Sequence, residues 1–141
     1  MARLGGGGGR FLRRGDPPGP TTRRAGVDVR FYRADVTDLS FLDDPFDLAL
    51  DIGCLHGVPP DRWERYAEGL ARLVRPGGLY LLYAFAPRPE RPTPRGIVPE
   101  EVRDLFAPAF VVEQEAVGED PNGPTAAWYR LRRQHLPADR L

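Results

Sequence analysis

The sequence predicts one α/β domain in which parallel strands are followed by a C-terminal antiparallel hairpin. Apolar runs at 46–52 and 79–86 have the length of buried strands, and the segment between them has helical periodicity. Two β-prone runs near the C-terminus flank the turn signal Asn122-Gly123, which predicts the hairpin. With 141 residues, the chain is long enough for one domain core and too short for two.

Bulk composition argues against several classes of protein. The 20 basic and 20 acidic residues balance, so charge gives no reason to expect nucleic acid or an anionic membrane as a partner. The single cysteine, Cys54, excludes an internal disulfide. No segment has the apolar core of a signal peptide or the ~20 apolar residues needed to span a bilayer. We therefore expect a cytoplasmic protein.

The first 26 residues are rich in glycine, proline and arginine and contain few large apolar side chains, which predicts a disordered tail. Within them, Gly5–Gly9 has the composition of a ligand-binding glycine loop. No apolar strand precedes this run and no helical pattern follows it, so we interpret it as low-complexity sequence. Residues 134–141 are predicted to form a C-terminal tail.

Two strands are expected before the helix. Val29, Phe31 and Tyr32 lie in a short β-prone run that ends at Ala34-Asp35. The second run, 46–52, is mostly apolar and is closed by Gly53, which is typical of a parallel strand covered on both faces. We therefore expect this second strand to be central in the sheet.

A helix is expected from Pro59-Pro60-Asp61, where proline suits the first turn and the carboxylate favours the positive end of the dipole. Large side chains then recur at i, i+3, i+4, i+7 and i+11 and should face the sheet: Trp63, Tyr66, Ala67, Leu70 and Val74. Arg75-Pro76-Gly77-Gly78 should stop this helix before the strand at 79–86. Strand, helix and strand in this order predict a parallel unit with a right-handed crossover.

The last third of the chain predicts a loop, a short helix and the hairpin. Residues 87–96 are rich in proline and arginine and should form a surface loop. A short helix should start at Pro99-Glu100-Glu101 and carry Val102, Leu105 and Phe106. The strands at 110–117 and 126–131 should then pair in an antiparallel arrangement.

Residues 27–133 resemble the second half of the class I S-adenosylmethionine-dependent methyltransferases, whose sheet closes with a reversed strand. Ala34-Asp35 resembles the acidic position that accepts a hydrogen bond from the adenine amino group. The stretch from Phe46 to His56 is similar to the fourth strand and its following loop, and Leu73–Leu82, with Arg-Pro-Gly-Gly inside it, is the most specific match. The Asp-x-Gly-x-x-His pattern is similar to small-molecule branches such as the thiopurine methyltransferase-like proteins.

The resemblance implies a Rossmann-like fold, S-adenosylmethionine as cofactor and methyl transfer to a small molecule. It implies that Asp35 accepts a hydrogen bond from adenine and that Val36 offers the ring a backbone amide. Asp51 would contact the cofactor's amino group or the substrate, or else cap backbone amides in the turn at Gly53. His56 would act as a catalytic base or orient the substrate, unless it is only a hydrogen-bonded loop histidine.

Other polar and aromatic residues allow weaker interpretations. Cys54 is either a nucleophile or, as we prefer, a small packing residue. Tyr83 and Phe85 either wall a substrate pocket or belong to the core. Three loop arginines either grip an acidic substrate or lie in solvent: Arg88, Arg91 and Arg95. No Cys/His cluster has metal-ligand spacing, and no Ser/His/Asp arrangement stands out, so no metal is expected.

The resemblance also implies that the first βαβ half is missing. In this family, a glycine-rich turn after the first strand and an acidic residue after the second hold the cofactor, and both would lie upstream of Val27. In the family's sheet order, 3-2-1-4-5-7-6, the strand at 29–34 would pair only with the absent second strand. The strand at 46–52 would lose one neighbour. Either the first strand moves across to fill this gap, or the domain is unstable alone and self-associates through the open edge.

Three functions follow from these expectations. The first is a truncated methyltransferase that binds its cofactor weakly or not at all, with an N-terminus that arose from a misplaced start or a frameshift. The alternative is a non-catalytic remnant that pairs its open edge with another protein. An RNA-binding arginine/glycine tail is disfavoured by the neutral net charge.

Overall fold

The computed structural model describes residues 29–119 and 125–137. The chain divides into two compact units, Met1–Val36 and Thr37–Leu141. In the first unit, the described residues 29–36 form no helix or strand. The predicted tail at 1–26, the turn at Asn122-Gly123 and residues 138–141 lie outside the described residues.

The second unit contains one mixed sheet with the predicted topology. Its elements are β1 (Phe46–Ile52), the short 3-10 helices η1 (Leu55–Gly57) and η2 (Pro60–Arg62), α1 (Trp63–Leu73), β2 (Val74–Phe85), α2 (Pro99–Phe106), β3 (Phe110–Glu119) and β4 (Thr125–Arg133). The strand order is β1-β2-β4-β3. β1 runs parallel to β2, whereas β4 is antiparallel to both β2 and β3. The parallel β-α-β unit and the C-terminal hairpin are therefore confirmed.

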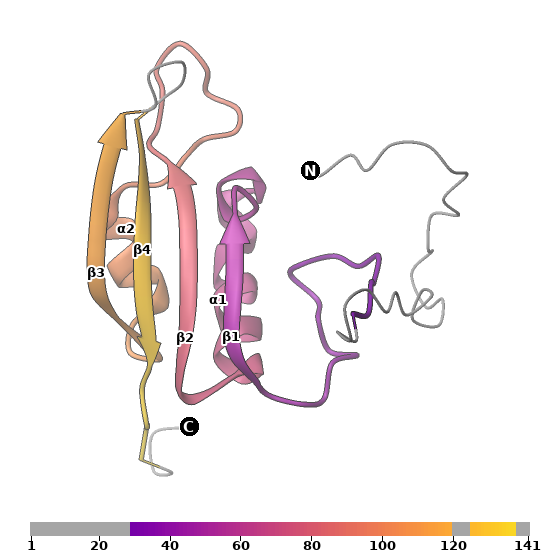
Figure 1. Cartoon of the computed structure of the whole chain (residues 1–141). Coiled ribbons are helices and arrows are strands. Elements are labelled where there is room, and N and C mark those ends of the chain that lie inside the picture. The colour runs from indigo at the N-terminus through magenta and orange to yellow at the C-terminus, as the bar shows by residue number, and fades with distance from the viewer. Residues whose placement is uncertain (1–28, 120–124, 138–141) are drawn as a thin grey trace. The chain divides into compact units, whose positions relative to one another are not determined.

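The core lies between the sheet and the two helices, which both cover the same face (Figure 1). Four residues of the predicted apolar stripe are buried in α1, namely Trp63, Tyr66, Ala67 and Leu70, whereas the fifth, Val74, is buried in β2. In α2 the buried residues are Val102 and Phe106. The side chains that fill this layer from the sheet are almost fully buried: Tyr80, Leu82, Ala84, Phe110, Tyr129 and Leu131. The opposite face of the sheet carries no helix among the described residues.

The strand predicted at 29–34 is wrong, because residues 29–35 have no regular structure. The idea that this segment joins the sheet beside β1 is wrong for the same reason. A strand exists only where a neighbour accepts and donates its backbone hydrogen bonds, and a β-prone sequence does not supply that neighbour.

The pattern-based prediction that 46–52 is a central strand covered on both faces is also wrong, whereas the prediction from the resemblance that this strand loses one neighbour is confirmed among the described residues. β1 has the predicted bounds, but it is an edge strand of the described sheet, and helices cover only one of its faces. Leu50 and Ile52 are consequently 58% and 61% exposed. Their apolar character fits a covered strand, so the pattern within the strand alone does not predict this exposure.

The chain reversal after α1 differs slightly from the prediction. The helix ends at Leu73, and β2 begins at Val74 rather than at Leu79. Phe46 pairs with Val74 while Leu48 pairs with Leu79, so residues 75–78 form an irregular bulge in β2. Gly77 has a φ of +80°, a backbone conformation that allows the chain to turn here without steric strain.

Candidate functional site

The loop after β1 is held by the carboxylate of Asp51. Its Oδ1 accepts a hydrogen bond from the backbone N–H of Cys54 at 2.7 Å, and its Oδ2 accepts one from the N–H of Leu55 at 3.0 Å. These two amides begin η1, where no earlier carbonyl can pair with them. Asp51 is only 5% exposed, so its side chain performs the capping role that the sequence allowed. Its contact with a cofactor stays a prediction and would have to form beside these bonds.

Two tyrosines that the sequence did not single out complete the Asp51 network. The hydroxyl of Tyr66 in α1 donates to Oδ2 of Asp51 and lies 3.0 Å from the hydroxyl of Tyr80 in β2. Burial, reinforced by negative charge nearby, raises the pKa of both phenols well above the ordinary value. The network therefore links β1, α1 and β2 beneath the loop. A signal was present, because a tyrosine in a buried helix face needs a partner for its hydroxyl.

His56 ties the loop to the end of β2. It is 5% exposed, and its Nδ1 accepts a hydrogen bond from the backbone N–H of Phe85 at 3.3 Å. The two rings pack with centroids 4.7 Å apart. Because Nδ1 is the acceptor, the neutral imidazole carries its proton on Nε2 and offers a donor there. This arrangement suits the orientation of a substrate better than the removal of a proton, and both roles stay predictions.

Acid should weaken the fold through His56. Burial lowers the pKa of His56 below its ordinary value of 6.5, and Arg88 adds to this while Asp51 opposes it. Below about pH 6.5, His56 therefore binds a proton more readily in the unfolded chain than in the folded chain. The free energy of unfolding consequently falls as the pH falls. Above that pH the contribution is fully present.

Urea unfolding at pH 7.5 and pH 5.0 measures this effect. The loss of stability between the two pH values should be smaller in His56→Asn than in the wild type, because asparagine keeps an acceptor for Phe85 but does not titrate. Carboxylates contribute equally to both proteins and cancel in the comparison. An identical loss in both proteins would contradict the prediction.

An aromatic cluster lies near His56 at the carboxyl end of β2. The ring of Tyr83 lies 5.7 Å from that of Phe85 and 5.0 Å from that of Trp128 in β4. Trp128 is 42% exposed, and both β2 residues are half-buried. They alternate with the core residues of β2, so they lie on the sheet face that the helices leave uncovered. Of the two roles considered for Tyr83 and Phe85, the wall of a pocket therefore fits better than the core.

The loop arginines and Cys54 are less suited to a site. Arg95 makes hydrogen bonds of 2.9 and 2.6 Å to the two carboxylate oxygens of Glu101 and lies over the ring of Trp63, so its guanidinium is already engaged. Arg88 lies over Phe85 at 5.9 Å. Burial and the charge of Asp51 raise the pKa of the Cys54 thiol, which opposes formation of a nucleophilic thiolate.

Asp35 and Val36 belong to the first unit, whereas Asp51 and His56 belong to the second. Asp35 is exposed and Val36 is half-buried. Within the second unit, Asp51 and His56 are brought together near the two ends of the segment 51–56. The adenine contacts predicted for Asp35 and Val36 stay predictions.

Comparisons with known proteins agree on one family. Residues 20–78 match a family model described as a methyltransferase domain. Over 90 residues, which are 63% of this chain and 30% of the relative, the sequence is 36% identical to the fatty-acid O-methyltransferase of Mycolicibacterium smegmatis (strain ATCC 700084 / mc(2)155). The match to the family model ends with the Arg-Pro-Gly-Gly segment at Gly78. The strand order β1-β2-β4-β3 corresponds to strands 4-5-7-6 of the methyltransferase sheet. The chain is thus similar to the class I S-adenosylmethionine-dependent methyltransferases.

Solved methyltransferases share the fold. The 1,6-didemethyltoxoflavin-N1-methyltransferase of Burkholderia thailandensis, with 1,6-didemethyltoxoflavin and S-adenosylhomocysteine bound, superposes with a TM-score of 0.63 at 25% identity, over 75% of this chain and 51% of that one. The N-methyltransferase NodS of Bradyrhizobium japonicum WM9, in complex with S-adenosylhomocysteine, gives a TM-score of 0.58 at 15% identity, over 72% and 53%. The chain thus spans about half of these methyltransferases and 30% of the curated relative.

The described residues provide only part of a methyltransferase cofactor site. Both carboxylate oxygens of Asp51 already accept hydrogen bonds from the protein, and no glycine-rich turn follows a strand within the described ranges. What the second unit does offer is the loop with His56 and the aromatic cluster beside it. These residues fit one wall of a site at the carboxyl ends of the strands, where ligands of such sheets bind.

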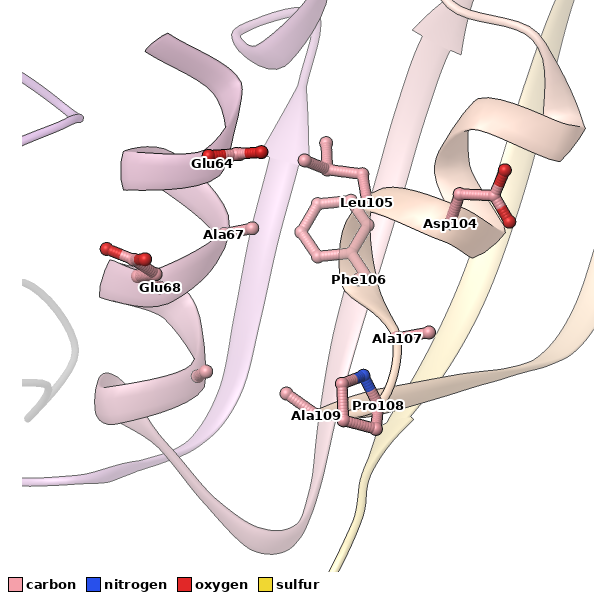
Figure 2. Close-up of a pocket in the computed structure, with 10 residues that line it drawn as sticks. Glu64, Ala67, Glu68, Asp104, Leu105, Phe106, Ala107, Pro108 and Ala109 are labelled. Carbon is pink, nitrogen blue, oxygen red and sulfur yellow. The ribbon is translucent and has the colours of Figure 1, made fainter. Parts of the chain in front are cut away.

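A groove lies between α1 and α2. It encloses about 510 Å³ and is lined from both helices and the segment after α2: Glu64, Ala67, Glu68, Ala71 and residues 104–109. Figure 2 shows Glu64 pointing across the groove toward Leu105, while Asp104 points away from it. Neither Asp51 nor His56 lines this groove. Neither helix among the described residues is long and apolar enough to cross a membrane.

Proposed function

We propose that this chain contributes the C-terminal half of a methyltransferase domain that transfers a methyl group from S-adenosylmethionine to a small molecule in the cytoplasm. The observation that carries the proposal is the sheet, in which a parallel β1-β2 pair is closed by the antiparallel β4 and then β3. That order corresponds to strands 4, 5, 7 and 6 of the family. The thiopurine methyltransferase-like branch stays a prediction.

The proposed reaction does not require a particular catalytic side chain. S-adenosylmethionine supplies a methyl group on a sulfonium centre, so transfer depends mainly on placing the acceptor in line with it and excluding water. In this chain, the Nε2–H of His56 offers a hydrogen bond to a polar group of the acceptor. Tyr83, Phe85 and Trp128 offer an apolar surface beside it.

A small acceptor is supported by the relatives. One is named for fatty acids and another was solved with 1,6-didemethyltoxoflavin, both of which are small molecules. The half-exposed aromatic cluster is chemically suited to an apolar or planar acceptor. The balanced charge of the chain gives no support for a nucleic acid as the acceptor.

Calorimetric titration of the purified full chain with S-adenosylmethionine tests the proposal. We expect saturable binding with a high-micromolar dissociation constant, because the described residues supply one wall of the site. Asp35→Asn should weaken binding about tenfold, or roughly 1.4 kcal/mol, if Asp35 accepts a hydrogen bond from adenine. Asp43→Asn, at another exposed acidic position, should leave the affinity unchanged.

A second candidate function is a non-catalytic methyltransferase remnant that pairs with another protein. The exposed apolar edge strand β1 favours it. A sample that is folded by circular dichroism but releases no heat with S-adenosylmethionine would contradict the enzyme and support the remnant.

A further inference from the structure

Arg88 is a half-buried arginine in the loop that leaves the carboxyl end of β2 (Figure 1). The guanidinium groups of the other half-buried arginines in the described ranges all donate hydrogen bonds: Arg62, Arg132 and Arg133. Arg88 donates none and makes no ion pair within the part of the chain that the structure describes, which also distinguishes it from Arg95 with its partner Glu101. Because a guanidinium that has lost part of its hydration favours an anionic partner, Arg88 is a candidate to bind a negatively charged ligand.

The guanidinium of Arg88 lies over an aromatic ring, and the backbone beside it is held by hydrogen bonds. Its Cζ atom is 5.9 Å from the centroid of the Phe85 ring. The carbonyl of Arg88 accepts a hydrogen bond from the N–H of Arg91 at 3.1 Å, and the N–H of Ile97 donates to the carbonyl of Phe85 at 2.9 Å. A contact with a ring uses the flat face of the guanidinium and leaves the N–H groups on its edge available. Arg88 is therefore prepared to donate two parallel hydrogen bonds to a planar anion.

The Phe85 ring connects Arg88 to the rest of the candidate site. The ring of His56 packs against that of Phe85. Burial is the main cause of the lowered pKa of His56, and the positive charge of Arg88 adds to it, so the guanidinium acts on this loop. From Phe85 the aromatic cluster continues through Tyr83 to Trp128. The candidate site thus has a cationic end and an aromatic surface beside it, and ligand sites commonly combine such an apolar wall with a few polar groups that fix the orientation of the ligand.

A methyl acceptor that matches this arrangement has a planar aromatic body and a carboxylate. The aromatic side chains of the cluster pack favourably against another flat ring, and a carboxylate accepts two hydrogen bonds from a guanidinium in one plane. A neutral acceptor would leave Arg88 without an anion, and the positive charge would repel a cationic acceptor.

We propose that Arg88 is a specificity-determining residue that binds the carboxylate of a planar aromatic acid, whose rings lie against Tyr83, Phe85 and Trp128. The assignment rests on the proposed function, because it treats the aromatic cluster as the binding surface for the methyl acceptor. Arg88 acts in it on the binding and orientation of the acceptor, and methyl transfer itself requires nothing from this side chain.

Calorimetric titration of the full chain at pH 7.5 with 2-naphthoate and with 2-naphthamide tests the proposal. The two probes share one ring system, and only the naphthoate carries a negative charge at this pH. We expect 2-naphthoate to bind about tenfold more tightly than 2-naphthamide. Arg88→Gln should abolish this difference, because it should weaken the binding of 2-naphthoate about tenfold and change that of 2-naphthamide by less than about twofold. Arg88→Lys keeps the charge without the planar fork and should bind 2-naphthoate with an intermediate affinity.

Arg91→Gln is the matched control for charge. Arg91 lies three residues further along the same loop, but it is exposed, so its replacement should change both affinities by less than about twofold. Trp128→Ala tests the aromatic surface and should weaken the binding of both probes about fivefold, because it removes a ring that both of them contact. Trp128 is 42% exposed and Arg88 is half-buried, so these variants should fold, as circular dichroism can verify.

Three results would overturn the proposal: a folded wild-type chain that does not bind 2-naphthoate, equal affinities of that chain for the two probes, and a loss in Arg91→Gln as large as that in Arg88→Gln. None of these titrations contains S-adenosylmethionine. A chain that binds S-adenosylmethionine but fails these tests keeps the proposed function and loses the role of Arg88. A chain that passes them but releases no heat with S-adenosylmethionine keeps the anion-binding arginine and loses the proposed function.

Discussion

Asp51→Ala is expected to lower the free energy of unfolding by about 3 kcal/mol, as measured by urea unfolding at pH 7.5. The carboxylate accepts hydrogen bonds from the N–H groups of Cys54 and Leu55 and from the hydroxyl of Tyr66. Removing it leaves three donors in a buried region without that partner, and each buried unpaired polar group costs about 1–3 kcal/mol. Asp51→Asn keeps one acceptor oxygen, so its free energy of unfolding should lie between those of the wild type and Asp51→Ala.

Asp47→Ala is the matched control for this prediction. Asp47 lies on the same strand, four residues earlier, but its side chain is 76% exposed and makes an ion pair of 2.9 Å with the exposed Arg75. Such surface pairs contribute at most about 1 kcal/mol, so this variant should stay within roughly 0.5 kcal/mol of the wild type. An equal loss of unfolding free energy in Asp51→Ala and Asp47→Ala would contradict the prediction. It would mean that the hydrogen bonds of Asp51 stabilise the fold no more than an exposed charge does.

The parts of the fold that the sequence predicted well are those set by local pattern. β1 has the predicted bounds because an apolar run of strand length ends at a glycine. The start of α1 and its buried stripe followed from proline placement and helical spacing. The pairing of β3 with β4 followed from two β-prone runs separated by a turn signal. In each case, the residues that determine the structure are close together in the sequence.

The parts that the sequence did not predict depend on neighbours far along the chain. Whether 29–34 becomes a strand depends on an adjacent strand, and the exposure of Leu50 depends on the absence of a cover over β1. The candidate site shows the same limit. The spacing placed Tyr66 on the buried side of α1, but only the fold brings its hydroxyl to Asp51, 15 residues earlier.

Gly78→Ala is expected to lower the free energy of unfolding by about 2 kcal/mol, because the added methyl group has no room. A Cβ at Gly78 would lie 2.8 Å from the carbonyl oxygen of Arg75 and 3.0 Å from that of Asp47. Both contacts are with backbone, and one belongs to β1, so relief requires β1 and β2 to separate where they are paired. Urea unfolding under the same conditions measures the loss.

Gly69→Ala provides the control with the opposite sign. Gly69 lies inside α1, and no atom beyond the backbone of its own helix and its chain neighbours would lie within 4 Å of an added Cβ. Alanine there should raise the free energy of unfolding by roughly 0.5–1 kcal/mol, because it restricts the unfolded chain and favours the helix. A loss of stability in Gly78→Ala together with a gain in Gly69→Ala would show that Gly78 is required by packing. The reason would be the close approach of β1 to the bulge in β2. A neutral result at Gly78 would mean that the two strands can move apart there without loss of stability.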